Sequence, residues 1–257
     1  MISIKKLCKS YGSLEVIKDL DLDVFEGEIL VILGASGVGK SVLLRQILGI
    51  ENPDSGCIQV DGKKISEMSS NELIDVRKQM GMLFQSAALF DSMTVGENVA
   101  FYLMQHEPNL SKKDIQKKVS EALAMVNMTG AEDKMPSDLS GGMRKRTALA
   151  RVIVYKPRMI LYDEPTTGLD PIMAMQINKM IVKIQNELPG RTSIVVTHDI
   201  KSAMEIADRI AFFNDKKIAF IDTKEKFINL QDPKIRAFFD NASITKEYLA
   251  DIMKGNS

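Results

Sequence analysis

One short segment, residues 34–41, constrains the fold of this chain more than any other. It fits the pattern G-x-x-x-x-G-K-[ST], in which a glycine-rich loop leads into a helix. The apolar, β-branched residues 29–33 come directly before it and predict a buried strand. Residues 42–48 follow with helical spacing and stop at Gly49. The sequence therefore predicts a strand, a glycine loop and a helix in that order.

This order suits the binding of phosphate. Gly34, Gly37 and Gly39 let the backbone turn so that N–H groups converge on a β-phosphate, and the helix start adds its unpaired N–H groups. Lys40 would reach the β and γ oxygens, and the Ser41 hydroxyl can coordinate Mg²⁺. The alternative is an ordinary glycine turn with a chance lysine. The motif alone does not choose between a kinase, a GTPase, a helicase and a transporter ATPase.

A pair of carboxylates at the end of an apolar segment is the second signal. Asp163 and Glu164 directly follow residues 159–162, which predict another buried strand. Neighbouring strand residues point to opposite sides, so the two acids cannot share one role. Asp163 would hold Mg²⁺ through a water and Ser41, and Glu164 would be the general base beside a γ-phosphate. The alternative is two strand-end acids that face solvent.

Charge and composition narrow the classes of partner. Lysine plus arginine and aspartate plus glutamate both number 34, so no basic field predicts binding to nucleic acid. The one dense basic run, residues 144–146, is expected to be a solvated helix face. Cys8 and Cys57 lack metal-ligand spacing, which favours reduced thiols in a cytosolic protein. The sequence contains neither an apolar run of the ~18 residues that a membrane span needs nor a signal-peptide pattern, so any membrane role is expected to come through a partner.

The rest of the chain predicts an α/β fold. Residues 2–7 and 14–25 alternate apolar and polar side chains, which indicates an antiparallel pair of strands. Later apolar strands alternate with helices, and this favours a parallel sheet covered on both faces. We predict one domain over residues 1–240, with a helical subdomain at about 92–157, and a helical tail over 241–257.

A further helix start lies in the sequence Leu139-Ser140-Gly141-Gly142-Met143. Ser140 can cap this helix, and the two glycines leave its first amides bare, which makes a second candidate anion site. Taken locally, Ser-Gly-Gly before a helix is also typical of an ordinary N-cap. Its position between Gln85 and the carboxylate pair is what gives it weight.

Taken together, these motifs resemble those of ATP-binding-cassette (ABC) ATPases over residues 1–225. The matching segments, in the family's order and approximate spacing, are 34–41, Gln85, 139–142, 162–165, 168–170 and 197–199. The resemblance implies a P-loop NTPase core of the RecA type with a parallel sheet, an N-terminal antiparallel β-subdomain and an inserted helical subdomain. It also implies hydrolysis of ATP to ADP and phosphate.

The resemblance implies roles for further residues. Gln85 would sense Mg²⁺ and the membrane partner, Asp170 would lie at a dimer contact, and His198 would bond the γ-phosphate. Tyr11 would stack on adenine, although a half-buried tyrosine at a strand end is the alternative. The expected site comprises the catalytic residues Lys40, Glu164 and His198, the Mg²⁺ site Ser41, Gln85 and Asp163, and the nucleotide-binding residues Tyr11, Gly34, Ala35, Ser36, Gly37, Val38, Gly39, Lys40, Ser41, Val42, Gln85, Ser140, Gly141, Gly142 and Asp170.

Two helix starts that bind anions raise the question of how they share one γ-phosphate. In the family, the signature loop (residues 139–142 here) of one subunit closes over the P-loop of the other. The resemblance therefore implies a homodimer that buries two ATP molecules. The spacing alone would also permit two separate sites.

A narrower resemblance concerns the transported substrate. Segments 40–44, 81–95, 142–146 and 232–239 look like the ATPases of Mla-type transporters. This implies a subunit at the cytoplasmic face of the inner membrane, with two integral-membrane permease subunits and an Mce-domain lipid-binding protein, that powers phospholipid transport between the inner and outer membranes. The alternatives are an ABC ATPase for another substrate and a soluble cassette protein that acts on DNA or ribosomes. The signature and His198 oppose a P-loop kinase or GTPase.

The tail carries one more prediction. Its apolar residues fall on one helical stripe, formed by Ile244, Tyr248, Leu249, Ile252 and Met253. A short isolated helix is marginal in water, so this stripe needs a surface to cover it. That surface is either its own domain or, by hypothesis, the other subunit, which the tail would then tether.

Overall fold

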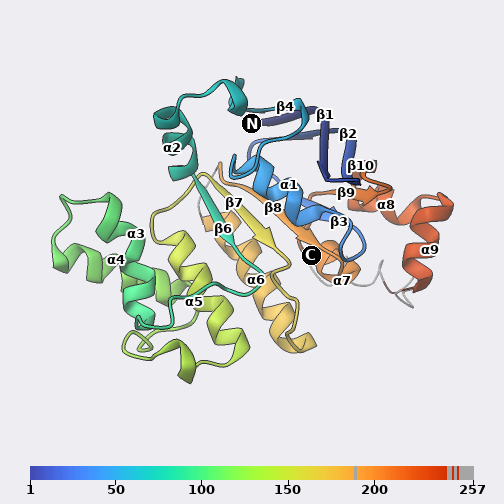
Figure 1. The fold of residues 1–257 in the computed structure, drawn as a ribbon. Helices are drawn as coiled ribbons and strands as arrows, with labels where there is room; N and C mark the ends of the chain where they lie inside the picture. Colours follow the sequence, from blue (N-terminus) through green and yellow to red (C-terminus); the bar gives the residue numbers. More distant parts are fainter. Residues whose placement is uncertain (188–189, 242–244, 246–247, 249–257) are drawn as a thin grey trace.

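A six-stranded sheet lies at the centre of the computed structural model, which describes residues 1–187, 190–241, 245 and 248. The strand order is β10-β9-β3-β8-β7-β6 (Figure 1). The bounds are β3 (Ile29–Leu33), β6 (Met80–Leu83), β7 (Met159–Asp163), β8 (Thr192–Thr197), β9 (Arg209–Asn214) and β10 (Lys217–Thr223). All neighbours pair in parallel except β9 and β10, which form an antiparallel hairpin.

Strand β3 shows why this sheet is buried on both faces. Its five residues are all buried and apolar, so neither side of the strand can face water. Ile29, Val31 and Leu33 pack into a core with the helices on one face. Leu30 and Ile32 pack into a second core on the opposite face. The strand that leads into residues 34–41 is therefore fixed from both sides.

A smaller antiparallel sheet covers the second core. Its order is β2-β1-β4-β5, with bounds β1 (Ile2–Tyr11), β2 (Leu14–Val24), β4 (Ser55–Val60) and β5 (Lys63–Lys64). Alternate residues of β1 and β2, such as Ile4, Leu20 and Leu22, are buried in that core. The predicted antiparallel pair is confirmed.

The helices lie around these sheets (Figure 1). Their bounds are α1 (Lys40–Ile47), α2 (Ser70–Lys78), α3 (Val95–His106), α4 (Lys112–Met125), α5 (Gly141–Ile153), α6 (Pro171–Glu187), α7 (Ile200–Ile206), α8 (Lys224–Asn229) and α9 (Pro233–Asn241). Figure 1 shows α3, α4 and α5 gathered at one side, away from the antiparallel sheet. Between β6 and β7 the chain is thus an inserted helical unit, and the predicted fold class is confirmed.

The sequence did not predict some of the elements. The hairpin β9–β10 and the helices α2 and α8 were not predicted. The domain bounds 1–240 and 92–157 stay a prediction. The predicted apolar stripe of the tail lies, apart from Tyr248, outside the described residues. Within the described ranges, no helix combines the length and the apolar character needed to cross a membrane.

Candidate nucleotide site

The P-loop, residues 34–41, runs from β3 into α1 and has the geometry of an anion site. Gly34 cannot carry a side chain, because a Cβ would lie 2.5 Å from the backbone oxygen of Phe213. Gly39 has φ of 114°, a conformation that favours glycine, and its added Cβ would lie 2.6 Å from Val16. Gly39 also stands at the N-cap position of α1 without a side-chain cap. The first amides of the helix are therefore left for a ligand.

The rest of the loop varies in exposure. Ala35, Ser36 and Gly37 are exposed, so the loop's outer face is open to a ligand. Val38 and Val42 pack partly against the core behind the loop. These two side chains anchor the loop, and the phosphate contacts are left to its backbone.

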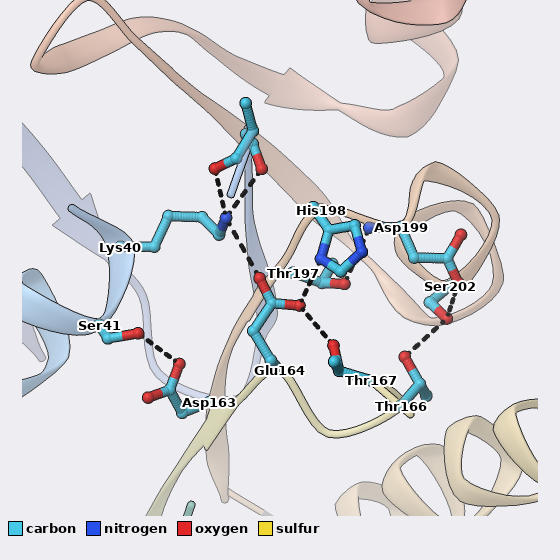
Figure 2. A network of polar contacts seen from close by, with 12 residues as sticks. Lys40, Ser41, Asp163, Glu164, Thr166, Thr167, Thr197, His198, Asp199 and Ser202 are labelled. Atoms are coloured by element: carbon cyan, nitrogen blue, oxygen red, sulfur yellow. Dashed lines mark hydrogen bonds and ion pairs between the residues drawn. The ribbon is translucent and has the colours of Figure 1, made fainter. Parts of the chain in front are cut away.

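Lys40 lies across the mouth of the P-loop. Its side chain is only 4% exposed, and Nζ donates to the backbone oxygens of Gly34 and Ala35, both at 2.8 Å. Nζ also lies 3.2 Å from Glu164 Oε1 (Figure 2). Burial lowers the pKa of Lys40, and the nearby carboxylates of Glu164 and Asp163 oppose this shift. The ammonium is thus held where a phosphate oxygen could replace a carbonyl or carboxylate partner.

Ser41 and Asp163 meet from two different elements. The Ser41 hydroxyl, in the first turn of α1, donates to Asp163 Oδ1 at 2.7 Å at the end of β7. Burial raises the pKa of Asp163, and the Ser41 bond opposes that change. Two hard oxygen ligands side by side fit Mg²⁺, which usually takes one or two protein oxygens and the rest from phosphate and water. The described residues contain no cluster of three or more histidine, cysteine or carboxylate side chains able to hold a metal.

Glu164 is the centre of a second group of contacts. Oε1 faces Lys40, while Oε2 accepts from His198 Nδ1 at 2.8 Å and from Thr167 Oγ1 at 3.1 Å (Figure 2). Its backbone has φ of 48°, in the left-handed region that a non-glycine residue rarely adopts. Its N–H donates to Val196 of β8 at 3.0 Å. The structure thus places an acid from β7, an imidazole that follows β8 and the P-loop lysine around one point.

The loop that carries His198 is fixed by a polar network. Asp199 caps α7, with Oδ1 accepting from the Lys201 N–H at 3.0 Å and Oδ2 accepting from Ser202 Oγ at 2.6 Å. Asn178 of α6 donates to Ser202 Oγ at 2.9 Å, which joins the two helices. A cavity of about 350 Å³ opens between α6 and this loop, with His198 in its wall. The imidazole is therefore held on one side and accessible on the other.

Tyr11 ends β1 beside the P-loop helix. The residue is 43% exposed, which agrees with a half-buried tyrosine at a strand end and also leaves part of the side chain accessible. Its hydroxyl donates to Glu51, and Glu51 also pairs with Arg45 of α1 at 3.1 Å. Lys9 lies 5.5 Å from the centre of the ring. Tyr11 is thus connected to α1 through Glu51 and Arg45, and part of its surface stays open for stacking.

Gln85 and Asp170 are placed differently from the residues above. Gln85 is exposed after β6, and no hydrogen bond among the described residues joins its side chain to Ser41 or Asp163. Asp170 Oδ1 accepts the N–H groups of Ile172 and Met173, each at 3.0 Å, at the start of α6. In the structure, Asp170 therefore caps the start of α6.

The signature segment forms the start of α5. Ser140 Oγ accepts the Met143 N–H at 3.3 Å, as the sequence predicted. Ser140 and Gly141 are exposed, while Gly142 is buried against Met173 of α6. In the part of the chain that is described, no hydrogen bond or ion pair links Ser140 or Gly141 to the P-loop. The second candidate anion site is open, and it is separate from the first within one chain.

The basic run 144–146 was expected to be a solvated helix face, and the structure contradicts this at Lys145 and in part at Arg146, which is half-buried and donates to Gln176. Lys145 of α5 belongs to the run that was expected to face solvent, yet it is only 5% exposed. Its Nζ donates to the backbone oxygens of Gln85 and Glu164. Its neighbour Arg144 is exposed, as expected. Helical spacing could have separated the two side chains, because residue 145 lies one turn from the buried residues 142 and 149.

Comparison with known proteins gives concordant results. The family model described as ABC transporter matches residues 17–167. The chain is 41% identical over 243 residues to the intermembrane phospholipid transport system ATP-binding protein MlaF of Haemophilus influenzae, covering 95% of this chain and 91% of the relative. It is 38% identical over 243 residues to the probable ribonucleotide transport ATP-binding protein mkl of Mycobacterium leprae, covering 95% of this chain and 70% of the relative.

A solved structure matches as well. It is the dimeric, post-hydrolysis state of the ATP-binding cassette MJ0796 bound to ADP and Pi, with a TM-score of 0.79 and 31% identity. The match covers 87% of this chain and 98% of the other. The helical insertion and the antiparallel sheet therefore belong to a known cassette architecture.

Proposed function

The chain belongs to the ABC transporter family of ATP-binding proteins, and from this premise we propose that it powers phospholipid transport between the inner and outer membranes. The chain is an ATPase of this family. The observation that carries the chemistry is the meeting of Lys40, Ser41, Asp163, Glu164 and His198 at the ends of neighbouring strands. In parallel sheets, ligands bind at this edge.

Each of these side chains has a distinct role in the proposal. Lys40 exchanges its carbonyl and Glu164 partners for the β and γ oxygens of ATP, which carry more negative charge. Glu164, freed from Lys40, accepts a proton from the attacking water. His198 donates to the γ-phosphate, and the P-loop amides hold the β-phosphate.

A bound Mg²⁺ fits this arrangement. Ser41 and Asp163 would hold it, with Gln85 as a further oxygen ligand once its exposed side chain turns inward. The ion would neutralise charge that develops on the phosphate oxygens during transfer. Removal of Mg²⁺ by a chelator is expected to stop phosphate release while ATP still binds, which a fluorescent ATP analogue can follow.

The substrate is argued from the relatives. The match to the phospholipid transport protein MlaF extends over 91% of that relative at 41% identity, whereas the match to mkl extends over 70% at 38% identity. We therefore prefer phospholipid to ribonucleotide as the transported molecule. We further propose a homodimer bound to two integral-membrane permease subunits and an Mce-domain lipid-binding protein, at the cytoplasmic face of the inner membrane. ABC transport of a different substrate, named by mkl, is the second candidate.

The complex can be tested directly. The chain is purified in detergent with its bound partners, which mass spectrometry then identifies together with any bound lipids. After reconstitution, ATP should drive transfer of labelled phospholipid, and the Glu164→Gln chain should not. Transfer of labelled ribonucleotide in place of phospholipid would favour the second candidate.

A further inference from the structure

Lys145 is a buried cation without an acidic partner. Its side chain lies on α5, one turn after the signature glycines, and is 5% exposed. Within the described residues, no carboxylate lies at ion-pair distance from its Nζ. Burial lowers the pKa of Lys145, and the more distant charges of Asp163 and Glu164 oppose this shift. Burial of an unpaired charge is costly, so the contacts that Lys145 makes deserve a functional explanation.

Those contacts are two backbone oxygens of the proposed site. Nζ donates to the oxygen of Gln85, just after β6, and to the oxygen of Glu164, just after β7, the latter at 3.4 Å. Strands β6 and β7 are parallel neighbours, so both carbonyls lie at the same edge of the sheet. One ammonium group therefore joins the segment of the proposed Mg²⁺ sensor to that of the proposed general base.

Glu164 needs such a restraint. Its backbone has φ of 48°, a strained left-handed conformation that persists only where surrounding contacts hold it. The N–H is held by Val196, and the carbonyl accepts from Thr167 N–H at 3.3 Å as well as from Lys145. The direction in which the Glu164 carboxylate leaves the backbone depends on these bonds. Loss of one of them would misplace the base without removing it.

The Gln85 segment has a second, separate restraint on the same helix. Arg151 donates to the backbone oxygens of Ala88 at 2.7 Å and Ala87 at 3.0 Å. Both alanines have positive φ, so this turn also depends on its partners. Arg151 has no hydrogen bond to Glu164 among the described contacts. The two basic residues thus allow the effect on Gln85 to be separated from the effect on Glu164.

We propose that Lys145 is a positioning residue that ties the backbones of Gln85 and Glu164 to the helix that starts at Ser140. It fixes the proposed base and Mg²⁺ sensor relative to each other, and it makes their geometry depend on the position of the signature helix. The inference rests on the proposed roles of Gln85 and Glu164 in ATP hydrolysis. It adds a residue that touches neither nucleotide nor metal.

The test is the Lys145→Met change in the full chain, which removes the donor and keeps most of the side-chain volume. We expect kcat to fall about 10-fold or more while KM for ATP changes less than about 2-fold, because nucleotide binding does not use the two carbonyls. The half-saturating Mg²⁺ concentration should rise about 3-fold or more, since Gln85 is displaced. The matched control is Lys117→Met, at an exposed lysine of α4, which should leave all three values unchanged.

Two further variants guard against a folding defect. Lys145→Gln is neutral but keeps two N–H donors, and it should recover part of kcat. Arg151→Met should raise the Mg²⁺ requirement and lower kcat less than Lys145→Met does. Should Lys145→Met fail to fold, Lys145→Gln carries the same test through the split between kcat and KM.

A double-mutant comparison identifies the route of the effect. If Lys145 acts through Gln85, the change in Mg²⁺ requirement on Lys145→Met should vanish in a Gln85→Ala background. The inference is overturned if Lys145→Met leaves kcat and the Mg²⁺ requirement at wild-type values, or if it lowers only the melting temperature. Those results would leave the proposed function untouched, because that function is tested separately by ATP-driven transfer of labelled phospholipid.

Discussion

Two helix starts in this molecule look alike in sequence and differ in their surroundings. The start of α1 has no side-chain cap and is ringed by Lys40, Asp163, Glu164 and His198, which come from three neighbouring strand ends. The start of α5 is capped by Ser140 and faces outward, and its described contacts involve no ionised side chain. The first has the acid, imidazole and lysine groups for phosphate chemistry, and the second offers helix amides, the helix dipole and the Ser140 hydroxyl.

The difference between the two helix starts follows from the elements that surround them. Parallel strands bring their carboxyl ends to one edge, so residues far apart in sequence gather around α1. Helix α5 belongs to the inserted helical unit (Figure 1), and among the described residues no hydrogen bond or ion pair joins the Ser140 side chain to the P-loop. If two chains face each other, the start of α5 in one chain can complete the site at the start of α1 in the other. We propose that arrangement for this protein, as in the family.

The largest expected effect is at the open helix start. Ser140→Arg should reduce ATP hydrolysis to background, a loss of about 10³-fold, because we propose that Ser140 donates to the γ-phosphate held by the other chain and a bulky side chain would replace it. ATP affinity in the monomer should stay within about 2-fold of wild type, since the P-loop is intact. Phosphate release and equilibrium binding of a fluorescent ATP analogue measure the two quantities.

The matched control is Ser111→Arg, which replaces the capping serine of α4 in the same way. It should leave hydrolysis unchanged apart from any loss of stability. Equal losses in the two variants would mean that Ser140 is an ordinary cap.

The site at the start of α1 is tested by the Glu164→Gln change. We expect turnover to fall about 10²-fold or more with ATP binding near wild type, because the base is lost while the phosphate cradle remains. ATP should then hold the dimer closed, which size-exclusion chromatography detects as a shift in mass. Turnover above half the wild-type rate would remove Glu164 from the catalytic role.

A smaller effect is expected at Tyr11, the residue proposed to stack on adenine beside α1. Tyr11→Ala should weaken ATP binding about 10-fold, since stacking of a base on an aromatic ring is worth about 1–3 kcal/mol. Tyr11→Phe keeps the ring and loses only the bond to Glu51, so its affinity should stay within about 3-fold. If both variants bind ATP as wild type does, Tyr11 is a strand-end residue and nothing more.

The sequence predicted the site at the start of α1 well, because the motifs that indicate it are local. The strand, glycine loop and helix are contiguous, and Asp163 and Glu164 follow an apolar run directly. The order of motifs then fixed the fold class through the family. The sequence predicted that Ser41 and Asp163 share one Mg²⁺ site, and the structure brings these residues, 122 positions apart, into a direct hydrogen bond.

What the sequence missed depends on tertiary contacts. Lys145 was assigned to solvent from its charge, and only the approach of β6 and β7 to α5 makes it buried. The hairpin β9–β10 lacks the alternation that revealed β1 and β2, because β9 is buried on both faces. Gln85 follows a predicted strand, but the direction of its side chain is not encoded locally.

The central claim is that a working site needs the α1 start of one chain and the α5 start of another. Lys40→Ala should abolish the first, since it deletes the cation that we propose binds the β and γ oxygens of ATP. Ser140→Arg abolishes the second. Each homodimer should therefore be inactive, for a different reason in each case.

The most direct measurement mixes these two inactive variants and follows phosphate release. If the sites are shared between chains, a heterodimer contains one site with both defects and one with neither, and activity returns where one intact site suffices for hydrolysis. The account predicts that activity returns on mixing, peaks at an equal ratio and reaches at most about a quarter of wild type, the fraction expected for intact sites after random pairing. A mixture that stays as inactive as its two components at every ratio would contradict it.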